Sequence, residues 1–288
     1  MRILVTGANG QLGMTFRAIA PKHPEHEFFF CTSKELDVTD PNSVEAVIQN
    51  YTPEVVINCA AYTAVDRAEE EPNKAYAVNA DGVKNLVDAC QKISAALIHF
   101  STDYVFDGRK NKPYTEIDEP NPINIYGKSK LAGEKHVLSS DLKATVIRTS
   151  WVYSEFGNNF VQTMLRLGRE RKSLNVVNDQ FGSPTYARDL AVASLIVAQY
   201  SKRFISPPSL YHFSNDGVIS WFDFASEIMI LAKSKCEICP ISSNLLPQLA
   251  ERPPFSVLKK SKFVEDFNLK TTNWKESLMK MIKDGILD

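Results

Sequence analysis

Gly7-Ala8-Asn9-Gly10-Gln11-Leu12-Gly13 is the stretch that decides the fold. It follows the apolar run Ile3-Leu4-Val5 directly and opens a helical pattern. A glycine turn between a strand and a helix turns backbone N–H groups and the positive helix end towards a pyrophosphate. Gly7 suits the tight turn, Gly10 the close approach of a ligand and Gly13 the packing of helix on strand. The spacing differs by one residue from the usual dinucleotide fingerprint, and a turn without a ligand is the alternative.

Short apolar runs alternate with helical patterns through the first half of the chain. The runs are 3–5, 28–31, 55–57, 97–100 and 145–147. They do not alternate with polar residues, as expected of strands buried on both faces of a parallel sheet. Helical spacing of apolar residues lies between them, at 42–49 and 73–93. This order predicts an α/β fold with a doubly wound parallel Rossmann sheet.

The alternation of apolar runs and helical patterns becomes irregular after about Trp151. Residues 1–152 are therefore predicted to form a dinucleotide-binding domain. A helix at 187–200 and a strand at 211–213 indicate that 184–217 returns to this domain. The remaining segments, 153–183 and 218–288, are predicted to form a smaller C-terminal substrate-binding lobe.

Composition argues against several classes of function. The 288 residues include 33 basic and 34 acidic ones, so charge gives no case for nucleic-acid or membrane binding. No apolar stretch approaches the roughly 18 residues of a bilayer span, and no signal peptide is visible, so a cytoplasmic location is expected. Five scattered cysteines argue against a disulfide framework. Cys236 and Cys239 match C-x-x-C but lack a second Cys or His pair, so no metal is predicted.

Tyr126 and Lys130 lie four positions apart at a predicted helix start. Residues at this spacing share a helical face, so the ammonium can approach the phenol. A free tyrosine titrates near pH ~10, and Lys130 is predicted to favour the phenolate and to hydrogen-bond a nicotinamide ribose. Thr102, after the fourth strand, can polarise a substrate carbonyl that Tyr126 protonates. The alternatives are an exposed helical face for the pair and a turn cap for Thr102.

The cofactor is predicted from the end of the second strand. Ser33 and Lys34 stand where an acidic residue would bind both adenosine ribose hydroxyls. An acid repels a 2′-phosphate, whereas hydroxyls and a lysine accept it, so NADPH is expected, with NADH as the alternative. The alternative for Lys34 is a solvated loop residue with no contact to the cofactor. The predicted cofactor residues are Gly7, Asn9, Gly10, Gln11, Leu12, Gly13, Ser33, Lys34, Asp37, Val38, Ala60, Ala61, Tyr62, Tyr126 and Lys130.

Seven stretches in order carry a family resemblance. They are 7–13, 58–66, 101–108, 126–134, 148–153, 179–186 and 252–256. Together they resemble the extended short-chain dehydrogenase/reductases and, among these, the dTDP-4-dehydrorhamnose reductases. The resemblance implies that Thr102, Tyr126 and Lys130 form the catalytic set. It also implies hydride delivery to C4 of a 4-keto-6-deoxyhexose attached to a nucleoside diphosphate.

The resemblance extends to substrate residues. It implies that Asp103 and Trp151 border the sugar, beside Thr102. Arg252 resembles a residue that could meet the diphosphate, since a guanidinium fork suits phosphate oxygens, and a surface salt bridge is the alternative. Asn79 resembles an asparagine that supports the active-site helix, with ordinary helix packing as the alternative. The expected partner is a nucleotide-sugar substrate, and a homodimer stays open.

Two rival functions remain. The regulatory beta subunit of methionine adenosyltransferase is similar in sequence to these reductases, and a retained cofactor fold does not prove turnover. A nucleotide-sugar epimerase would hold NAD+ tightly. The intact Thr102, Tyr126 and Lys130 set, with Trp151, favours an NAD(P)H-dependent reductase that makes dTDP-L-rhamnose or a close nucleotide deoxysugar.

Overall fold

The computed structural model describes residues 1–201 and 208–285. Its centre is a six-stranded parallel sheet in the order β10-β5-β4-β3-β1-β2. The strands are β1 (Arg2–Thr6), β2 (Glu27–Phe30), β3 (Val55–Asn58), β4 (Ala96–Thr102), β5 (Ala144–Thr149) and β10 (Ser209–His212). The chain moves outward from β1 in both directions, so the sheet is doubly wound and the predicted fold class is confirmed.

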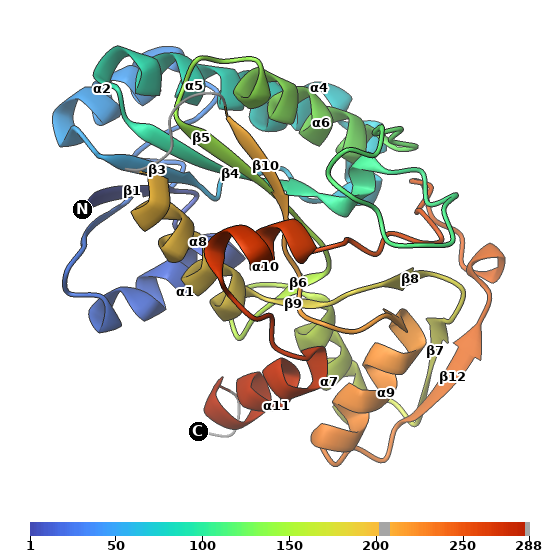
Figure 1. Ribbon diagram of the computed structural model, residues 1–288. Coiled ribbons are helices and arrows are strands. Elements are labelled where there is room, and N and C mark those ends of the chain that lie inside the picture. The colour runs from blue at the N-terminus through green and yellow to red at the C-terminus, as the bar shows by residue number, and fades with distance from the viewer. Residues whose placement is uncertain (202–207, 286–288) are drawn as a thin grey trace.

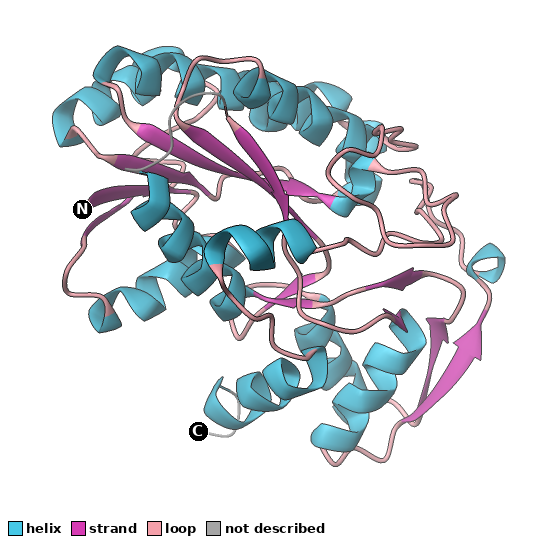
Figure 2. Ribbon diagram, viewed as in Figure 1, coloured by secondary structure: helices cyan, strands magenta, loops and turns pink. Residues whose placement is uncertain are grey.

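Helices cover both faces of the sheet (Figures 1 and 2). One face carries α2 (Pro41–Tyr51), α5 (Gly82–Ile93) and α6 (Ile125–Leu138), and the other carries α1 (Gln11–Ile19), α8 (Ala187–Ser201) and α10 (Ser261–Phe267). Ile3 and Val5 pack on the second face, and Leu4 on the first. Because both faces are covered, every strand position can be apolar, which explains the unalternated runs.

The helical pattern at 73–93 forms three pieces rather than one helix. After the short α3 (Val65–Glu70), the chain forms α4 (Pro72–Tyr76), a π-helical segment (Ala77–Asp81) and α5. A π-helical turn admits one extra residue and re-aims the side chains on it. Asn79 lies in this segment and is buried.

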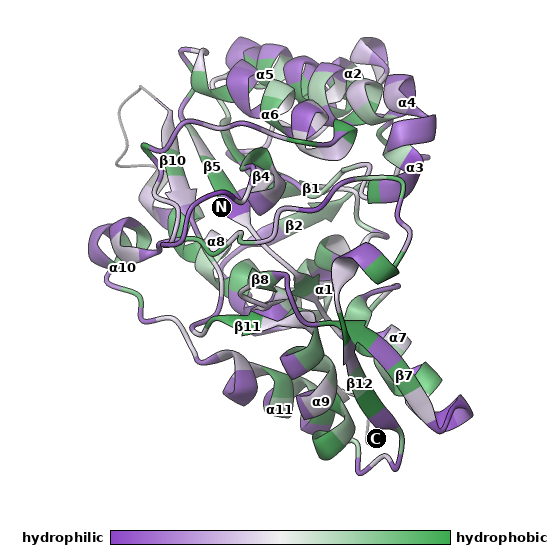
Figure 3. Ribbon diagram, turned by 90° about the vertical axis from the view of Figure 1, so that its right-hand side faces the viewer, coloured by the Kyte–Doolittle hydropathy of each residue, from purple (hydrophilic) through white to green (hydrophobic). Residues whose placement is uncertain are grey.

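A second core lies below the sheet, as Figures 1 and 3 show. Its helices are α7 (Phe160–Glu170), α9 (Trp221–Leu231) and α11 (Trp274–Gly285). Its two-stranded sheets are β7 (Ser173–Val177) with β12 (Glu237–Ile241), β6 (Val152–Tyr153) with β9 (Thr185–Tyr186), and β8 (Phe181–Gly182) with β11 (Ile219–Ser220). Apolar side chains of α7, α9 and α11 form one cluster, so this lobe has a core of its own.

Some residues within 218–288 pack on the main sheet. Phe263 and Phe267 of α10 contact Tyr211 of β10 edge-on. Residues 202–207 and 286–288, which fall inside the ranges assigned from the sequence, lie outside the described residues. Within the described ranges, no helix combines the length and apolarity needed to cross a bilayer.

Candidate active site

A cavity of about 550 Å³ opens at the carboxyl ends of β1, β3, β4 and β5. Ligands bind outside this end of the strands in open α/β sheets, because the loops there diverge at the switch point. Eleven predicted site residues line the cavity together. They are Asn9, Gly10, Gln11, Leu12, Ala60, Ala61, Thr102, Asp103, Tyr126, Lys130 and Trp151.

The glycine turn is shaped by close backbone contacts. Gly7 has a φ of 61°, and a Cβ there would lie 2.7 Å from the Ala60 nitrogen. A Cβ on Gly13 would lie 2.6 Å from the Ala8 Cα. These two glycines therefore act through packing, and neither lines the cavity.

The start of α1 is suited to an anion. Gly10 is its N-cap residue and offers no side-chain hydrogen bond, and the first turn holds no acidic residue. The first N–H groups of a helix have no partner within the helix, so a pyrophosphate can satisfy them. The residues at this helix end fit the dinucleotide that the sequence predicts.

The predicted adenosine residues lie outside the cavity. Ser33, Lys34 and Asp37 are exposed. Val38 is buried in the core and would touch a Cβ on Gly82. Their contact with a cofactor stays a prediction.

Thr102, the last residue of β4, and Asp103 after it line the cavity. The Thr102 hydroxyl donates to Asp103 Oδ1 at 3.1 Å and accepts from the Tyr104 nitrogen at 3.2 Å. Thr102 therefore caps its own turn and faces the cavity as well. Burial raises the pKa of Asp103 to about 7, although hydrogen bonds from Ser256 and Thr102 oppose this.

Tyr126 lies in the first turn of α6. The Asn124 side chain caps this helix by accepting from the Gly127 nitrogen at 2.8 Å. Burial raises the pKa of Tyr126 to about 12, and a hydrogen bond with the Thr102 side chain lowers it. Thr102 and Tyr126 both line the cavity, and burial favours the neutral form of the phenol.

Lys130 has the Phe100 carbonyl as its hydrogen-bond partner, and its expected effect on the Tyr126 phenol stays a prediction. The Lys130 ammonium donates to the carbonyl oxygen of Phe100 at 2.5 Å. Burial lowers its pKa to about 8, and the charge of Glu134 opposes that shift. With the ammonium engaged by β4, burial has the largest effect on the pKa of the phenol.

Asn79 ties α6 to the loop after β3. Its Oδ1 accepts from the Tyr62 nitrogen at 2.9 Å, and its Nδ2 donates to the Tyr62 carbonyl and to Ser129 Oγ, each at 3.0 Å. Ser129 lies between Tyr126 and Lys130 in sequence. Asn79 therefore supports the helix in the way that the resemblance implies, and Tyr62 acts through its backbone.

A buried ion pair holds α6 on the sheet. The Arg148 guanidinium of β5 pairs with the Glu134 carboxylate, with Nε to Oε2 at 3.0 Å. Both side chains are almost fully buried, and Glu134 lies one helical turn beyond Lys130. The sequence did not predict this pair, because nothing in the spacing of residues 134 and 148 brings them together.

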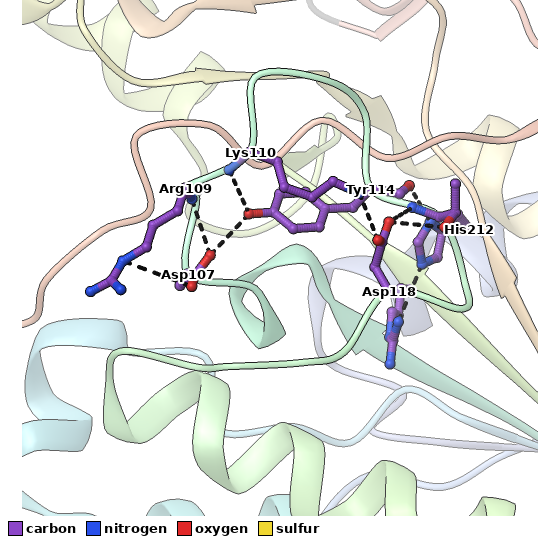
Figure 4. Close-up of polar contacts among 8 residues, drawn as sticks. Asp107, Arg109, Lys110, Tyr114, Asp118 and His212 are labelled. Atoms are coloured by element: carbon purple, nitrogen blue, oxygen red, sulfur yellow. Dashed lines mark hydrogen bonds and ion pairs between the residues drawn. The ribbon is translucent and has the colours of Figure 1, made fainter.

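The loop between Thr102 and Tyr126 is fixed by its own polar contacts (Figure 4). The Tyr114 hydroxyl donates to Asp107 Oδ1 at 3.0 Å, and Lys110 Nζ pairs with Asp118 Oδ1 at 2.6 Å. His212 Nδ1 lies 3.1 Å from the Tyr114 carbonyl, and burial lowers the pKa of His212 to about 3, so its ring is neutral and donates. The loop is thereby joined to β10.

Arg252 makes a different contact from the one expected. Its Nη1 donates to Asp66 Oδ1 at 2.7 Å, and its Nη2 to Oδ2 at 2.5 Å. That hydrogen bonding is the main reason why the pKa of Asp66 falls to about 2. Arg252 does not line the cavity. The salt bridge, named as the alternative from the sequence, is the contact that the structure has.

Further residues that line the cavity were not predicted as site residues. They include Asn58, Cys59, Thr63, Ser150, Val152, Gly157, Asn158 and Asn159. Gln11 Nε2 donates to the Val152 carbonyl at 3.0 Å, which joins the glycine turn to β6. The Gly/Asn composition of 157–159 is a turn signal only, and its place beside Gln11 is a tertiary contact.

The C-x-x-C pair lies away from this cavity. Cys236, directly before β12, and Cys239, within it, are free thiols. Among residues 1–201 and 208–285, no three His, Cys, Asp or Glu side chains gather as a metal would require.

The fold and the cavity define a class. A doubly wound sheet with an uncapped glycine turn, facing Thr102, Tyr126 and Lys130, is that of a dinucleotide-dependent oxidoreductase of the extended short-chain dehydrogenase/reductase type. The chain belongs to the RmlD substrate binding domain family, whose pattern matches residues 1–286.

Similar proteins span the same length. A dTDP-4-dehydrorhamnose reductase of Aggregatibacter actinomycetemcomitans is 39% identical, covering 96% of this chain and 97% of the relative. The spore coat polysaccharide biosynthesis protein SpsK of Bacillus subtilis is also 39% identical, covering 98% and 97%. The crystal structure of a dTDP-4-dehydrorhamnose reductase from Bacillus anthracis, in complex with NADP, is 41% identical with a TM-score of 0.93, covering 98% and 99%. A UDP-glucose 4-epimerase of Thermus thermophilus, 19% identical with a TM-score of 0.81, shares the fold.

Proposed function

We propose that the protein reduces the 4-keto group of dTDP-4-dehydro-L-rhamnose to the hydroxyl of dTDP-L-rhamnose, with NADPH as the hydride donor. One observation carries this proposal. Thr102, Tyr126 and Lys130 line the same cavity as the uncapped start of α1. The relatives named for this activity match the chain over nearly all of its length.

Thr102 and Tyr126 act on the carbonyl oxygen. Reduced nicotinamide, when bound, supplies a hydride to the carbonyl carbon. The Thr102 hydroxyl turns from Asp103 to the substrate oxygen and polarises the C=O bond. Tyr126 gives its phenolic proton to this oxygen as negative charge develops there. A pKa of about 12 keeps Tyr126 protonated at neutral pH, which is the form that an acid requires.

Lys130 compensates the negative charge of the phenolate. Once Tyr126 has given up its proton, the phenolate is buried and needs a nearby cation. The Lys130 ammonium lies one helical turn away and is buried on the same cavity. We propose that a cofactor ribose competes with the Phe100 carbonyl for this ammonium and draws it towards the phenol.

The cofactor preference rests on the end of β2. Ser33 and Lys34 are exposed beyond this strand, where a 2′-phosphate would meet a hydroxyl and a cation. We propose NADPH as the preferred cofactor, with Asp37 and Val38 beside the adenine. NADH is the alternative.

The substrate would lie between the main sheet and the lobe. We propose that Thr102, Asp103 and Trp151 contact the sugar, and that 153–183 with 218–288 form the substrate-binding lobe. Asp66 already engages Arg252, so a substrate diphosphate would have to replace this carboxylate to bind the guanidinium. We also propose a cytoplasmic location for the protein. Its oligomeric state, monomer or homodimer, would be measured by light scattering.

The decisive experiment is product identification. Purified protein is incubated with NADPH and a panel of nucleotide 4-keto-6-deoxyhexoses, and each product is identified with its configuration at C4. We expect consumption of NADPH and formation of dTDP-L-rhamnose. A regulatory subunit would consume no NADPH and would be recovered with a protein partner. An epimerase would release NAD+ on denaturation and would show no net oxidation of NADPH.

A further inference from the structure

Trp151 has an unusual backbone conformation at the edge of the cavity. Its φ is 47°, in the left-handed region that large side chains rarely adopt. It stands between β5 and β6, where the chain leaves the main sheet for the lobe. It lines the cavity, and the next residue, Val152, accepts a hydrogen bond from Gln11 of the glycine turn. A strained residue at such a place persists only when the surrounding contacts fix it.

Two neighbours fix the indole of Trp151. The ring of Trp221 stacks on it, with centroids 3.5 Å apart and planes 10° from parallel. Gly182 also lies against it, since a Cβ there would lie 2.6 Å from Trp151 Cε2. Any other residue at position 182 would displace the indole. Trp221 follows β11, which pairs with the strand that contains Gly182.

Trp221 is itself held firmly. It is the first residue of α9, and a capping box fixes this helix start through Ser220 and Asp223. Ser220 Oγ accepts from the Asp223 nitrogen at 3.1 Å, and the Ser220 nitrogen donates to Asp223 Oδ2 at 2.9 Å. The ring of Phe160, from α7, lies 4.6 Å from that of Trp221. Trp221 does not line the cavity, so any effect on a ligand passes through Trp151.

We propose that Trp221 and Gly182 are positioning residues that hold the Trp151 indole as a preformed apolar wall for the sugar ring of the nucleotide-sugar substrate. This inference rests on the proposed function. A wall ordered before binding saves the entropy of ordering it during binding, so its loss weakens sugar binding. Loss of the wall does not alter the proton donor, Tyr126, or the glycine turn. Trp221 therefore affects sugar affinity and leaves cofactor affinity and chemistry nearly unchanged.

The test uses substitutions at Trp221 and a matched tryptophan control. Trp221→Leu keeps an apolar side chain but removes the stack, and Trp221→Phe keeps a smaller ring. Trp274→Phe removes a tryptophan that contacts Phe224 and Gly217. Stacked indoles couple their electronic transitions, so circular dichroism of the wild type should show a paired positive and negative band. We expect this feature to disappear in both Trp221 variants and to persist in Trp274→Phe.

Kinetics and binding then separate positioning from general stability. We expect Trp221→Leu to raise the KM of the keto sugar about tenfold and Trp221→Phe about threefold. The KM of NADPH and kcat should change less than about twofold. Calorimetry with the product, dTDP-L-rhamnose, should give a parallel loss of affinity without requiring turnover.

Other outcomes would overturn the inference. It fails if folded Trp221→Leu binds dTDP-L-rhamnose as tightly as the wild type. If Trp221→Leu does not fold, an unchanged product affinity in Trp221→Phe, once its dichroism shows the stack lost, counts equally against it. A wild type that binds dTDP-L-rhamnose yet reduces no 4-keto sugar contradicts the proposed function alone. A wild type that does not bind this nucleotide sugar contradicts both.

Discussion

The Lys130 ammonium donates its hydrogen bond to the carbonyl oxygen of Phe100, 2.5 Å away. The lysine of the catalytic helix is therefore anchored to β4, and its charge is directed at the sheet. Tyr126, one turn earlier on α6, has a pKa raised by burial to about 12. The phenol is thus held protonated. We propose that the positive charge of Lys130 stabilises the Tyr126 phenolate after proton transfer.

Removing the phenolic hydroxyl should abolish most turnover. Tyr126→Phe keeps the ring that contacts Tyr104 edge-on, so folding and NADPH affinity should be nearly unchanged. Loss of a positioned proton donor lowers rates by about 10² to 10⁴-fold. Steady-state reduction of the keto sugar measures this, with Tyr104→Phe as a control that removes a phenol outside the cavity. Near-normal kcat in Tyr126→Phe would exclude Tyr126 as the proton donor.

Activity should decline on the basic side as Lys130 loses its charge. Its folded pKa of about 8 lies below the ordinary 10.5, so the neutral amine accumulates above about pH 8. Tyr126 stays protonated over this range and cannot account for the decline. We expect kcat/KM to fall above about pH 8, and Lys130→Arg, whose guanidinium stays charged, to lose this limb even if its rate is lower. An unchanged basic limb in the arginine variant would assign it to another group.

The Asp103 carboxylate should destabilise the fold at neutral and basic pH. Burial raises its pKa from 3.8 to about 7, so the folded state binds the proton more tightly than the unfolded state does. The contribution of Asp103 to the free energy of unfolding is complete below about pH 4 and is lost as pH rises through 7. Asp103→Asn should therefore raise the free energy of unfolding at pH 8 by a few kcal/mol, and hardly at all near pH 4.

Denaturant titrations at several pH values measure this effect. Asp118→Asn is the control of opposite sign. Burial alone would raise the pKa of Asp118, but hydrogen bonds from Lys110 and Thr115 outweigh it and give a value of about 2. Its carboxylate contributes stability above about pH 4 that is lost as pH falls through 2, so its replacement should destabilise the protein at pH 8. Equal effects of Asp103→Asn at pH 4 and pH 8 would contradict the shift.

Arg252 and Asp66 should behave as one unit in stability. The pair joins the segment before Pro253 to the first turn of α3, and it is partly exposed, so it is worth about 1 kcal/mol or less. We expect Arg252→Gln and Asp66→Asn to destabilise the protein similarly, and the double variant to add little, in a double-mutant cycle. The KM of the keto sugar should be alike in both single variants. A rise confined to Arg252→Gln would assign this residue to the diphosphate instead.

Local patterns predicted the elements of the main sheet because strands and helices depend on periodicity. The apolar runs near 3–5 and 55–57 became β1 and β3, since a strand covered on both faces leaves a continuous signal. The pattern at 73–93 did not predict the π-helical turn around Asn79. Asn79 in this turn hydrogen-bonds Tyr62 and Ser129, which lie 17 and 50 positions away and so leave no signal in the local pattern.

The sequence by itself determined the fold class, the glycine turn and the pairing of Tyr126 with Lys130 on one helical face, because each depends on residues within a few positions of one another. Only the tertiary structure decided where the charges and rings point. Lys130 turns to Phe100, Arg252 to Asp66 and Trp151 to Trp221. Burial and long-range packing set these partners, and no local pattern encodes the distance between residues that are 30 to 186 positions apart.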